Sequence, residues 1–498
     1  MKRALICELR CPYCGGGFEI ASESQADAER LRYGLLRCRC FEFPVVDGIL
    51  LLSLANASGG LEPLQPYVAL LAAAVMHLQK NDVAGLRDWM RRHMPLAAEL
   101  LDGGPEQPYL AFAARLGAEL APRIHQHLQE LGRYEVLGTH VTAPPARQSL
   151  RGSLAALRRL VGGAIEAVPA RASRSGEIAQ LQDPQAAKFY APRTNALALR
   201  LGSLPWNGRV LSLRCGHGVV ENLLRALDLG PELVSIDDQL LNLLIARRYA
   251  NRSGSYILHD LHCPLPFRDE LFDGVFAAGL PEIPTQKTCA EQAVRVTAAT
   301  GWTFFDRIWN LESGVVRVNG ERHDRFCQNF FARLEDYIDF FRECAGPTRQ
   351  IGIDVPRATA EYRDSGRWMF EPGEIDARLK LREALELSAL IVDPRHFAGF
   401  APAAPLKAMT PQRLSISPAF KLADRAGEDI RYERRAQFAR FDAAPVARHF
   451  AGYPERLNLK TTQFADAGYL FEQFCAAHVV FMPPAFDRET ALLINTSS

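Results

Sequence analysis

Hydrophobic and polar positions change their spacing along the chain, and each change marks a different kind of segment. Between residues 187 and 398, short apolar runs alternate with amphipathic stretches of helical period. The apolar runs lie at 209–213, 233–236, 256–258, 272–277, 303–305 and 387–392, and the helical stretches lie near 219–227, 240–249, 289–296, 326–343 and 378–387. This alternation is typical of a parallel sheet wound with helices, so we expect an α/β domain with helices on both faces of the sheet.

The flanking segments follow other patterns. Residues 1–52 contain short strand-like runs near Leu5, at 18–20 and at 45–52, separated by glycines, which predicts a small β-rich module. A stretch rich in Ala, Leu and Arg follows, with helical spacing at 68–78, 97–101 and 110–120, and then an aperiodic linker. We therefore divide the chain into an N-terminal module at 1–55, a helical segment and linker at 56–186, the α/β domain at 187–398 and a mixed C-terminal extension at 399–498.

Composition and charge exclude several classes of protein. The 498 residues are too many for one hydrophobic core, and 48% hydrophobic with 23% charged residues is typical of globular domains. With 58 basic and 57 acidic residues and no long run of one sign, binding to nucleic acid is not indicated. The apolar run at 68–76 is too short to span a membrane, and residues 1–14 do not form a signal peptide. We expect a cytoplasmic protein without a membrane partner.

Two cysteine pairs near the N-terminus have the spacing of metal ligands. Cys11 and Cys14 form a CxxC pair in a glycine-rich stretch, and Cys38 and Cys40 form a CxC pair. Four thiolates from two such turns suit tetrahedral zinc, and a module this small needs a metal to stabilise it. We predict one structural zinc at these four residues, with Cys7 as a spare ligand and ordinary buried cysteines as the alternative.

The same stretch carries a resemblance to a known module. The runs LRCPYCGGGFEI and GLLRCRCFEFPVVDGILLL resemble the short zinc ribbon often found in front of, or bound to, class I methyltransferases. The resemblance implies that the module is structural or mediates contacts, so a protein partner is an expectation. With four protein ligands, its zinc has no open position for water and therefore no catalytic role.

A glycine-rich turn after the first strand of the α/β domain is the strongest chemical signal. The strand at 209–213 is followed by Gly216 and Gly218 and then by a helix, which lets a ligand approach the backbone at the carboxyl edge of the sheet. The next strand ends in Asp237, an acidic residue suited to the two hydroxyls of a ribose, and the third ends in Asp260. These positions predict a nucleotide-type binding site.

The order of these features resembles class I S-adenosylmethionine-dependent methyltransferases, in particular the group similar to methyltransferase type 11. Past Asp260, the runs LPF and LFDGVF complete the pattern. The resemblance implies a Rossmann-like seven-stranded sheet in which Gly216 and Gly218 line the methionine end of the cofactor. It further implies that Asp237 holds the ribose, and Asp260 with Leu261 the adenine; Tyr190 and Arg193 correspond to residues that close such pockets.

The cofactor loop departs from the family in two main positions. Ser212 stands where the family has an acidic residue, and Arg214 stands where it has the first glycine; His217 adds bulk. The Arg214 guanidinium either fills the pocket or swings out to pair with the cofactor carboxylate. The hypotheses are an active methyltransferase and, as the alternative, an inactive methyltransferase-like pseudoenzyme that binds or scaffolds. A dehydrogenase would need a full GxGxxG, and hydrolase motifs are missing.

No catalytic residue stands out, which is compatible with methyl transfer because the cofactor already activates the methyl group. Glu282, His259 and His262 are candidate bases, although structural roles are as consistent with their positions. The aromatic run at 367–370 is a candidate acceptor pocket or part of the core. The methyl acceptor, a small molecule or a protein, is not identified by the sequence.

Overall fold

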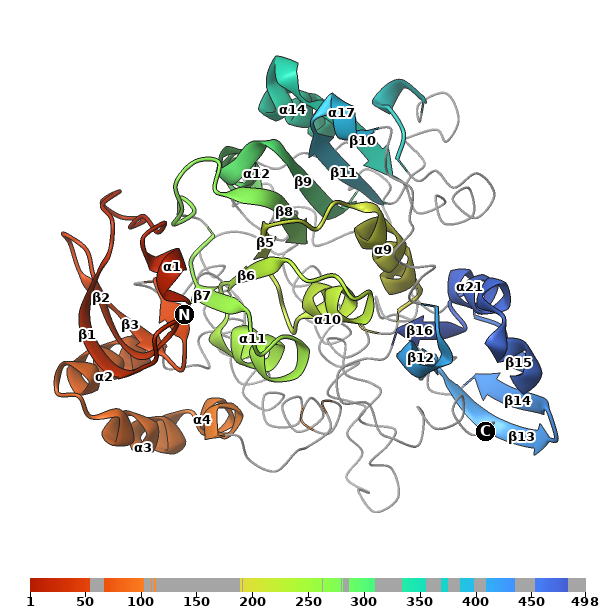
Figure 1. The fold of residues 1–498 in the computed structure, drawn as a ribbon, viewed down its shortest axis with the longest axis horizontal. Helices are drawn as coiled ribbons and strands as arrows, with labels where there is room; N and C mark the ends of the chain where they lie inside the picture. Colours follow the sequence, from red (N-terminus) through yellow and green to blue (C-terminus); the bar gives the residue numbers. More distant parts are fainter. Residues whose placement is uncertain are drawn as a thin grey trace, which may run out of the picture. The chain divides into compact units, whose positions relative to one another are not determined.

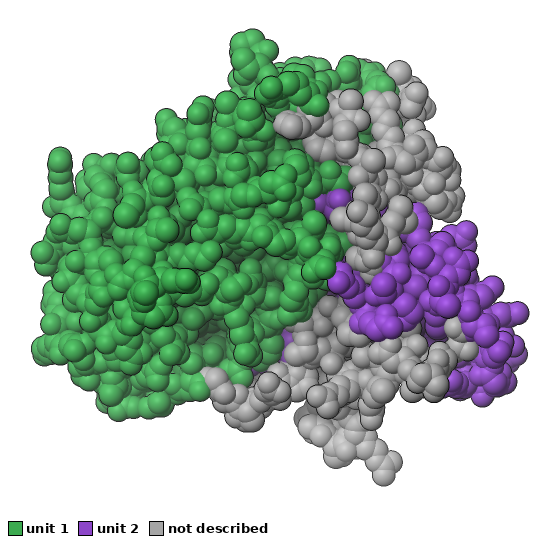
Figure 2. Space-filling model, viewed as in Figure 1, with its two compact units in different colours: residues 1–104, 203–402 green, residues 105–202, 403–498 purple. Residues whose placement is uncertain are grey.

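The structure, a computed structural model, describes residues 1–53, 67–102, 109, 112, 189, 191–261, 263–278, 280, 286–309, 334–354, 369–374, 386–397, 409–434 and 453–481. The chain forms two compact units (Figure 2). The first contains residues 1–104 and 203–402, and the second contains residues 105–202 and 403–498. Among the described helices, none is both long enough and apolar enough to cross a membrane.

One large sheet organises the first unit. Its eleven strands in the described residues follow the order β1-β2-β3-β4-β7-β6-β5-β8-β9-β11-β10 (Figure 1). The strands are β1 (Glu19–Ala26), β2 (Leu31–Arg37), β3 (Glu42–Val46), β4 (Ile49–Leu51), β5 (Arg209–Leu213), β6 (Glu232–Asp237), β7 (Ser255–Leu258), β8 (Phe272–Ala278), β9 (Thr297–Trp309), β10 (Gln350–Asp354) and β11 (Glu386–Val392). The sheet is thus larger than the seven strands predicted, because the N-terminal module contributes four strands to it.

The centre of this sheet is parallel. Six neighbouring strands, β4, β7, β6, β5, β8 and β9, pair in parallel, and antiparallel strands complete both edges. Parallel strands buried on both faces consist of nearly continuous apolar residues, as in β5 and β7, where every residue but Arg209 is buried. The predicted large, mostly parallel sheet of an α/β protein is confirmed and fits a Rossmann-like methyltransferase fold.

Helices connect the parallel strands in two directions. The first unit has α1 (Arg3–Ile6), α2 (Tyr67–Gln79), α3 (Val83–His93), α4 (Pro95–Asp102), α10 (Val219–Ala226), α11 (Leu240–Ile245) with the π-helical segment η2 (Ala246–Ala250), α12 (Gln286–Val296), α14 (Leu334–Ala345), η4 (Gly346–Thr348) and α17 (Pro394–Phe397). The chain passes from β5 to β6 and β7 through α10 and α11, and then returns past β5 to β8 and through α12 to β9. Because such crossovers are right-handed, the two directions put α10 and α11 on one face and α12 on the other.

Most predicted elements of the α/β region are confirmed, with three differences. A strand at Leu5 is wrong, because Leu5 lies in the single helical turn α1, which is too short to show a helical period. The helix predicted at 378–387 overlaps the start of β11, and its other residues up to 385 lie outside the described part of the chain. Strand β10 was not predicted, because the alternation of Ile351 and Ile353 extends over only five residues and includes a glycine.

The N-terminal module is joined to the α/β part through its own backbone. A turn at Asp47 and Gly48, both with positive φ (49° and 79°), reverses the chain between β3 and β4. Two such residues form the tight turn typical of hairpins. It directs β4 alongside β7, where Ile49 pairs with Tyr256 and the Leu52 amide donates to the Leu258 carbonyl at 2.8 Å. The module is therefore part of the α/β sheet.

A buried carboxylate strengthens this junction. Asp47, only 7% exposed, accepts hydrogen bonds from Arg32 Nε on β2 at 2.6 Å and from Arg247 Nη1 on η2 at 2.5 Å. The two arginines come from the module and from the α/β part. Asp47 thus links both parts with charge-assisted hydrogen bonds, which are stronger than neutral ones.

We predict that Asp47→Ala lowers the free energy of unfolding by about 1–3 kcal/mol, because it leaves two guanidinium groups without their carboxylate. Chemical denaturation of the purified chain measures this change. Asp269→Ala is the matched control, since Asp269 also pairs with an arginine, Arg295 at 2.6 Å, but its side chain is 73% exposed. Exposed pairs contribute about 0–1 kcal/mol, so equal losses in the two variants would contradict the prediction.

The second unit combines α9 with the C-terminal elements. It contains α9 (Pro192–Ser203), which ends one residue past the unit boundary, η6 (Pro411–Arg413), β12 (Leu414–Ile416), β13 (Phe420–Ala426), β14 (Asp429–Arg434), β15 (Arg456–Lys460), η7 (Thr461–Ala465), α21 (Ala467–Cys475) and β16 (Val479–Phe481). Strands β13, β14 and β15 form one antiparallel sheet, and β12 pairs with β16. The buried Asn195 side chain of α9 donates to the carbonyls of Phe474 and Val479, each at 2.8 Å. These bonds tie a segment from before β5 to the end of the chain.

Candidate functional site

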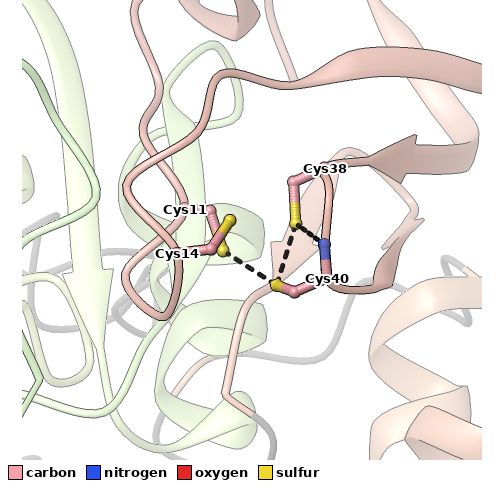
Figure 3. Close-up of side chains that lie close together, drawn as sticks. All are labelled: Cys11, Cys14, Cys38 and Cys40. Atoms are coloured by element: carbon pink, nitrogen blue, oxygen red, sulfur yellow. Dashed lines mark hydrogen bonds between the residues drawn. The ribbon is translucent and has the colours of Figure 1, made fainter.

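Four cysteine side chains meet in the N-terminal module. The ligand atoms of Cys11, Cys14, Cys38 and Cys40 all lie within 4.8 Å of one another (Figure 3). Cys40 Sγ lies 3.2 Å from Cys38 Sγ and 3.5 Å from Cys11 Sγ. Tetrahedral zinc with Zn–S bonds of about 2.3 Å would separate its sulfurs by about 3.8 Å. The cluster can therefore hold a metal ion with little movement, and it contains the four predicted cysteines without Cys7.

The turn around the first pair favours a thiolate. The Cys11 amide donates to the Gly16 carbonyl and the Gly15 amide to the Cys11 carbonyl, both at 2.8 Å, which closes the loop. The Gly16 backbone amide lowers the pKa of the Cys14 thiol to about 7, because it stabilises the negative charge. Burial raises the pKa of Cys11, and the neighbouring Cys38 sulfur raises that of Cys40. A divalent cation would offset the repulsion between such crowded thiolates.

The predicted cofactor loop lies at the reversal point of the parallel sheet. Gly216 and Gly218 lie between β5 and α10, as predicted, with φ of 55° and 89°. Strand β5 is flanked by β6 on one side and by β8 on the other, so the connections leave it in opposite directions. In parallel α/β sheets, ligands bind in the crevice that this divergence opens at the carboxyl ends of the strands.

The structure brings Asp237 and the glycine loop together. The Gly216 amide donates to Asp237 Oδ2 at 2.9 Å, and Asp237 Oδ1 accepts the Gln239 amide and Asn242 Nδ2, also at 2.9 Å. Asp237 is only 2% exposed. The carboxylate therefore holds the loop against the end of β6, a structural role like the strand-end cap that the sequence allows for Asp237 as an alternative.

The two loop glycines differ in their surroundings. A Cβ on Gly218 would lie 2.7 Å from the Ala250 Cβ and 3.0 Å from the Ala246 Cβ, so this glycine lets the loop pack against η2. Beside Gly216, no described residue other than its chain neighbours has an atom within 4 Å of the position of a Cβ. Among the described residues, the open space that a ligand needs thus lies at Gly216, and the absence of a side chain at Gly218 serves packing.

Arg214 has a backbone conformation that favours glycine. Its φ is 54°, in the left-handed region, which costs a residue with a side chain about 1 kcal/mol. Burial raises the pKa of the Asp238 carboxyl to about 7, the charge of Asp237 adds to this rise, and Arg214 opposes it. The guanidinium of Arg214 thus acts electrostatically on Asp238, an acidic residue that the sequence reading passed over although it directly follows Asp237.

The remaining predicted residues lie near the end of β7 or elsewhere. Asp260 and the buried Leu261 follow β7, and the Cys263 amide donates to the Asp260 carbonyl at 2.9 Å. His259 is fully buried, and this burial lowers its pKa to about 4, so it carries no charge at neutral pH. Arg193 lies on α9 of the second unit. Tyr190, His262, Glu282 and residues 367 and 368 lie outside the described residues, and Met369 and Phe370 are buried.

Glu221 is a site residue that the sequence analysis missed. It lies in the first turn of α10, is 1% exposed, and its Oε1 accepts a hydrogen bond from Ser235 Oγ of β6 at 2.7 Å. Burial raises the pKa of its carboxyl. The signal was present as an acidic residue on the apolar face of a predicted helix, where burial of a charge is costly.

Comparisons with known proteins give structural likenesses at low identity. No protein-family model matches the sequence, and no curated protein matches it. A methyltransferase-like structure from Bacillus halodurans shares 18% identity over 40% of this chain and 96% of its own, with a TM-score of 0.27. Phosphoethanolamine N-methyltransferase 2 from Haemonchus contortus, bound to S-adenosyl-L-methionine, shares 14% over 41% and 52%, with a TM-score of 0.30.

A third similar structure is a complex of two proteins. It joins the Trm112 methyltransferase activator of Haloferax volcanii to a methyltransferase, and it shares 18% identity over 42% of this chain and 98% of the matched chain, with a TM-score of 0.28. The fold assignment rests on the strand order and pairing of the sheet itself.

Proposed function

We propose that the α/β domain at 187–398 binds S-adenosylmethionine and transfers its methyl group to an acceptor. The observation that carries this proposal is the contact between Gly216 and Asp237 at the carboxyl edge of β5, where the sheet reverses its order. A glycine turn with open space beside it and an acidic residue on the next strand suit an adenosyl ligand. The resemblance of the sequence to class I methyltransferases adds the kind of reaction.

The residues present fit this ligand at the loop and depart from the family beside it. Gly216 would lie against the methionine end, Asp237 would take the ribose hydroxyls while still holding the loop, and Asp260 with Leu261 would hold the adenine. The bound cofactor supplies a methyl group that is already activated for displacement. The protein then has to bind and orient the acceptor, which contributes through proximity.

We further propose that Cys11, Cys14, Cys38 and Cys40 hold one zinc ion. All four positions of a tetrahedral site are then filled by protein, so the metal stabilises the N-terminal module and takes no part in methyl transfer. Because strand β4 of this module pairs with β7, a metal that stabilises the module would also stabilise the sheet of the α/β part.

Arg214 favours a second candidate function, that of a binding or scaffold protein without catalysis. Its guanidinium adds a positive charge to the loop that would face the cationic sulfonium of the cofactor, and like charges repel. In this alternative, the fold keeps the shape of the pocket but not its affinity.

Titration calorimetry of the full chain with S-adenosylhomocysteine and S-adenosylmethionine tests the proposal. We expect saturable binding to one site, with a Kd at or below about 100 μM, a moderate affinity for a preformed pocket. Binding only after Arg214→Gly would support the inactive alternative. If neither wild type nor Arg214→Gly binds either ligand, the proposed function is wrong.

A further inference from the structure

The cofactor loop lies next to a small buried network that contains the Glu221 carboxyl group. Ser212 on β5 and Ser235 on β6 are register partners in the parallel sheet, and both are buried. Glu221 reaches them from α10, where it accepts the Ser235 hydroxyl through Oε1. Its second oxygen, Oε2, has no hydrogen-bond partner among the described residues, and neither does Ser212 Oγ.

The Glu221 carboxyl also acts on Ser212 and on the loop. The Ser212 hydroxyl lies close enough to stabilise a negative charge on Glu221, although the two groups do not reach hydrogen-bonding geometry. Burial raises the pKa of the Cys215 thiol, which belongs to the loop, and the charges of Glu221 and Asp237 add to this rise. Glu221 lies in the first turn of α10, three residues after Gly218, and is bonded to Ser235, the register partner of Ser212, so it lies next to the loop and to strands β5 and β6.

We propose that Glu221 supplies, from helix α10, the acidic group that the resemblance places on β5 at position 212, and that it acts as a positioning residue of the cofactor loop. This inference rests on the proposed function. In this chain, the carboxyl is then carried by Glu221 on the helix and not by position 212 on the strand, and the small side chain of Ser212 leaves space for it.

The physical argument concerns a further carboxyl group beside Glu221. Burial raises the pKa of Glu221, and the charge of Asp237 adds to this rise. An acidic residue at position 212 would place another carboxyl opposite Glu221, and at least one of them would then stay protonated or the fold would lose stability. A residue as small as Ser212 avoids this conflict and leaves Glu221 as the carboxyl at this place.

The test combines ligand binding with thermal unfolding of the full chain. The variants are Glu221→Gln, Ser212→Asp, Glu221→Ala and the exchange Ser212→Asp with Glu221→Ala. Glu221→Gln keeps the acceptor for Ser235 and should therefore fold, but it lacks the charge. The matched control is Asp306→Asn, because Asp306 is also buried and accepts a serine hydroxyl, from Ser388 at 2.9 Å, on strands β9 and β11.

We expect Glu221→Gln to weaken binding of S-adenosylmethionine about fivefold or more, because the loop loses the charge that positions it, and the control to stay within about twofold. The exchange should bind at least about threefold more tightly than Glu221→Ala, because it returns a carboxyl to the same space. Unchanged affinity in Glu221→Gln, or no recovery in the exchange, overturns the inference while leaving the proposed function intact.

If wild type binds no ligand and the proposed function fails, thermal unfolding still tests whether positions 212 and 221 share one site. Ser212→Asp alone should lower the unfolding temperature, and adding Glu221→Ala should raise it again, because one carboxyl is removed from a space that holds two. Independent, additive effects of the two changes would show that positions 212 and 221 do not share a site, and the inference would then be wrong.

Discussion

Asp237→Ala is expected to abolish measurable binding of S-adenosylhomocysteine and to lower the free energy of unfolding by about 2–4 kcal/mol. The substitution removes the acceptor of three hydrogen bonds from described residues: the amides of Gly216 and Gln239 and the Asn242 side chain. These donors are then left without a partner next to a loop of positive φ. Calorimetric titration and urea denaturation of the same preparation measure the two effects.

Asp273→Ala provides the control for this experiment. Asp273 Oδ2 also accepts a backbone amide, that of Arg209 at 2.8 Å, but it lies at the amino ends of β5 and β8 and is exposed. We expect this variant to bind the ligand like wild type and to lose less stability. Equal binding by Asp237→Ala and wild type would contradict the assignment of the ribose position to Asp237.

Removal of the metal is expected to have the largest effect on stability. Wild type should contain one zinc per chain by elemental analysis, and Cys11→Ser with Cys38→Ser should contain none. Structural zinc sites contribute about 10–16 kcal/mol of binding free energy in small zinc-binding domains, so loss of the metal should lower the unfolding temperature by more than about 10 °C. A melting curve followed by circular dichroism measures this.

Cys7→Ser serves as the control, because Cys7 is exposed and lies outside the cysteine cluster. It should retain both zinc and the wild-type melting temperature. The prediction is wrong if wild type contains well under one zinc per chain, or if the double variant keeps full stability.

The parallel centre of the fold could be predicted because its signal is local. Strand β5 coincides with the predicted run at 209–213, since a buried strand shows itself as a continuous apolar segment between polar or glycine residues. Strand β1 extends well beyond the short predicted run at 18–20, because its residues Ser22 to Ala26 are mostly polar and lie on an edge. The pairing of β4 with β7 could not be predicted from the residues of either strand, since the register between strands distant in sequence depends on the tertiary structure.

The candidate site was predictable in its positions and not in its contacts. The positions of Gly216 and Asp237 follow from a strand–turn–helix pattern, but the hydrogen bond that joins them at 2.9 Å was not predicted. The packing of Gly218 against Ala246 and Ala250 depends on a helix that enters from the next crossover. Glu221 was missed for a related reason. Its carboxyl accepts a hydrogen bond from Ser235, which lies on β6 and not on the helix of Glu221.

The parallel pairing of β4 with β7 also constrains how the chain folds. Ile49 finds its partner Tyr256 only after everything between them has been synthesised, and contacts this distant in sequence slow folding because a long loop has to close first. Until then, the nascent N-terminal module exposes the unpaired edge of β4, which can pair with other chains. If the cysteines bind the proposed zinc early, the metal would keep the N-terminal module compact until β7 is made, and efficient production of the protein would then depend on the supply of metal during translation.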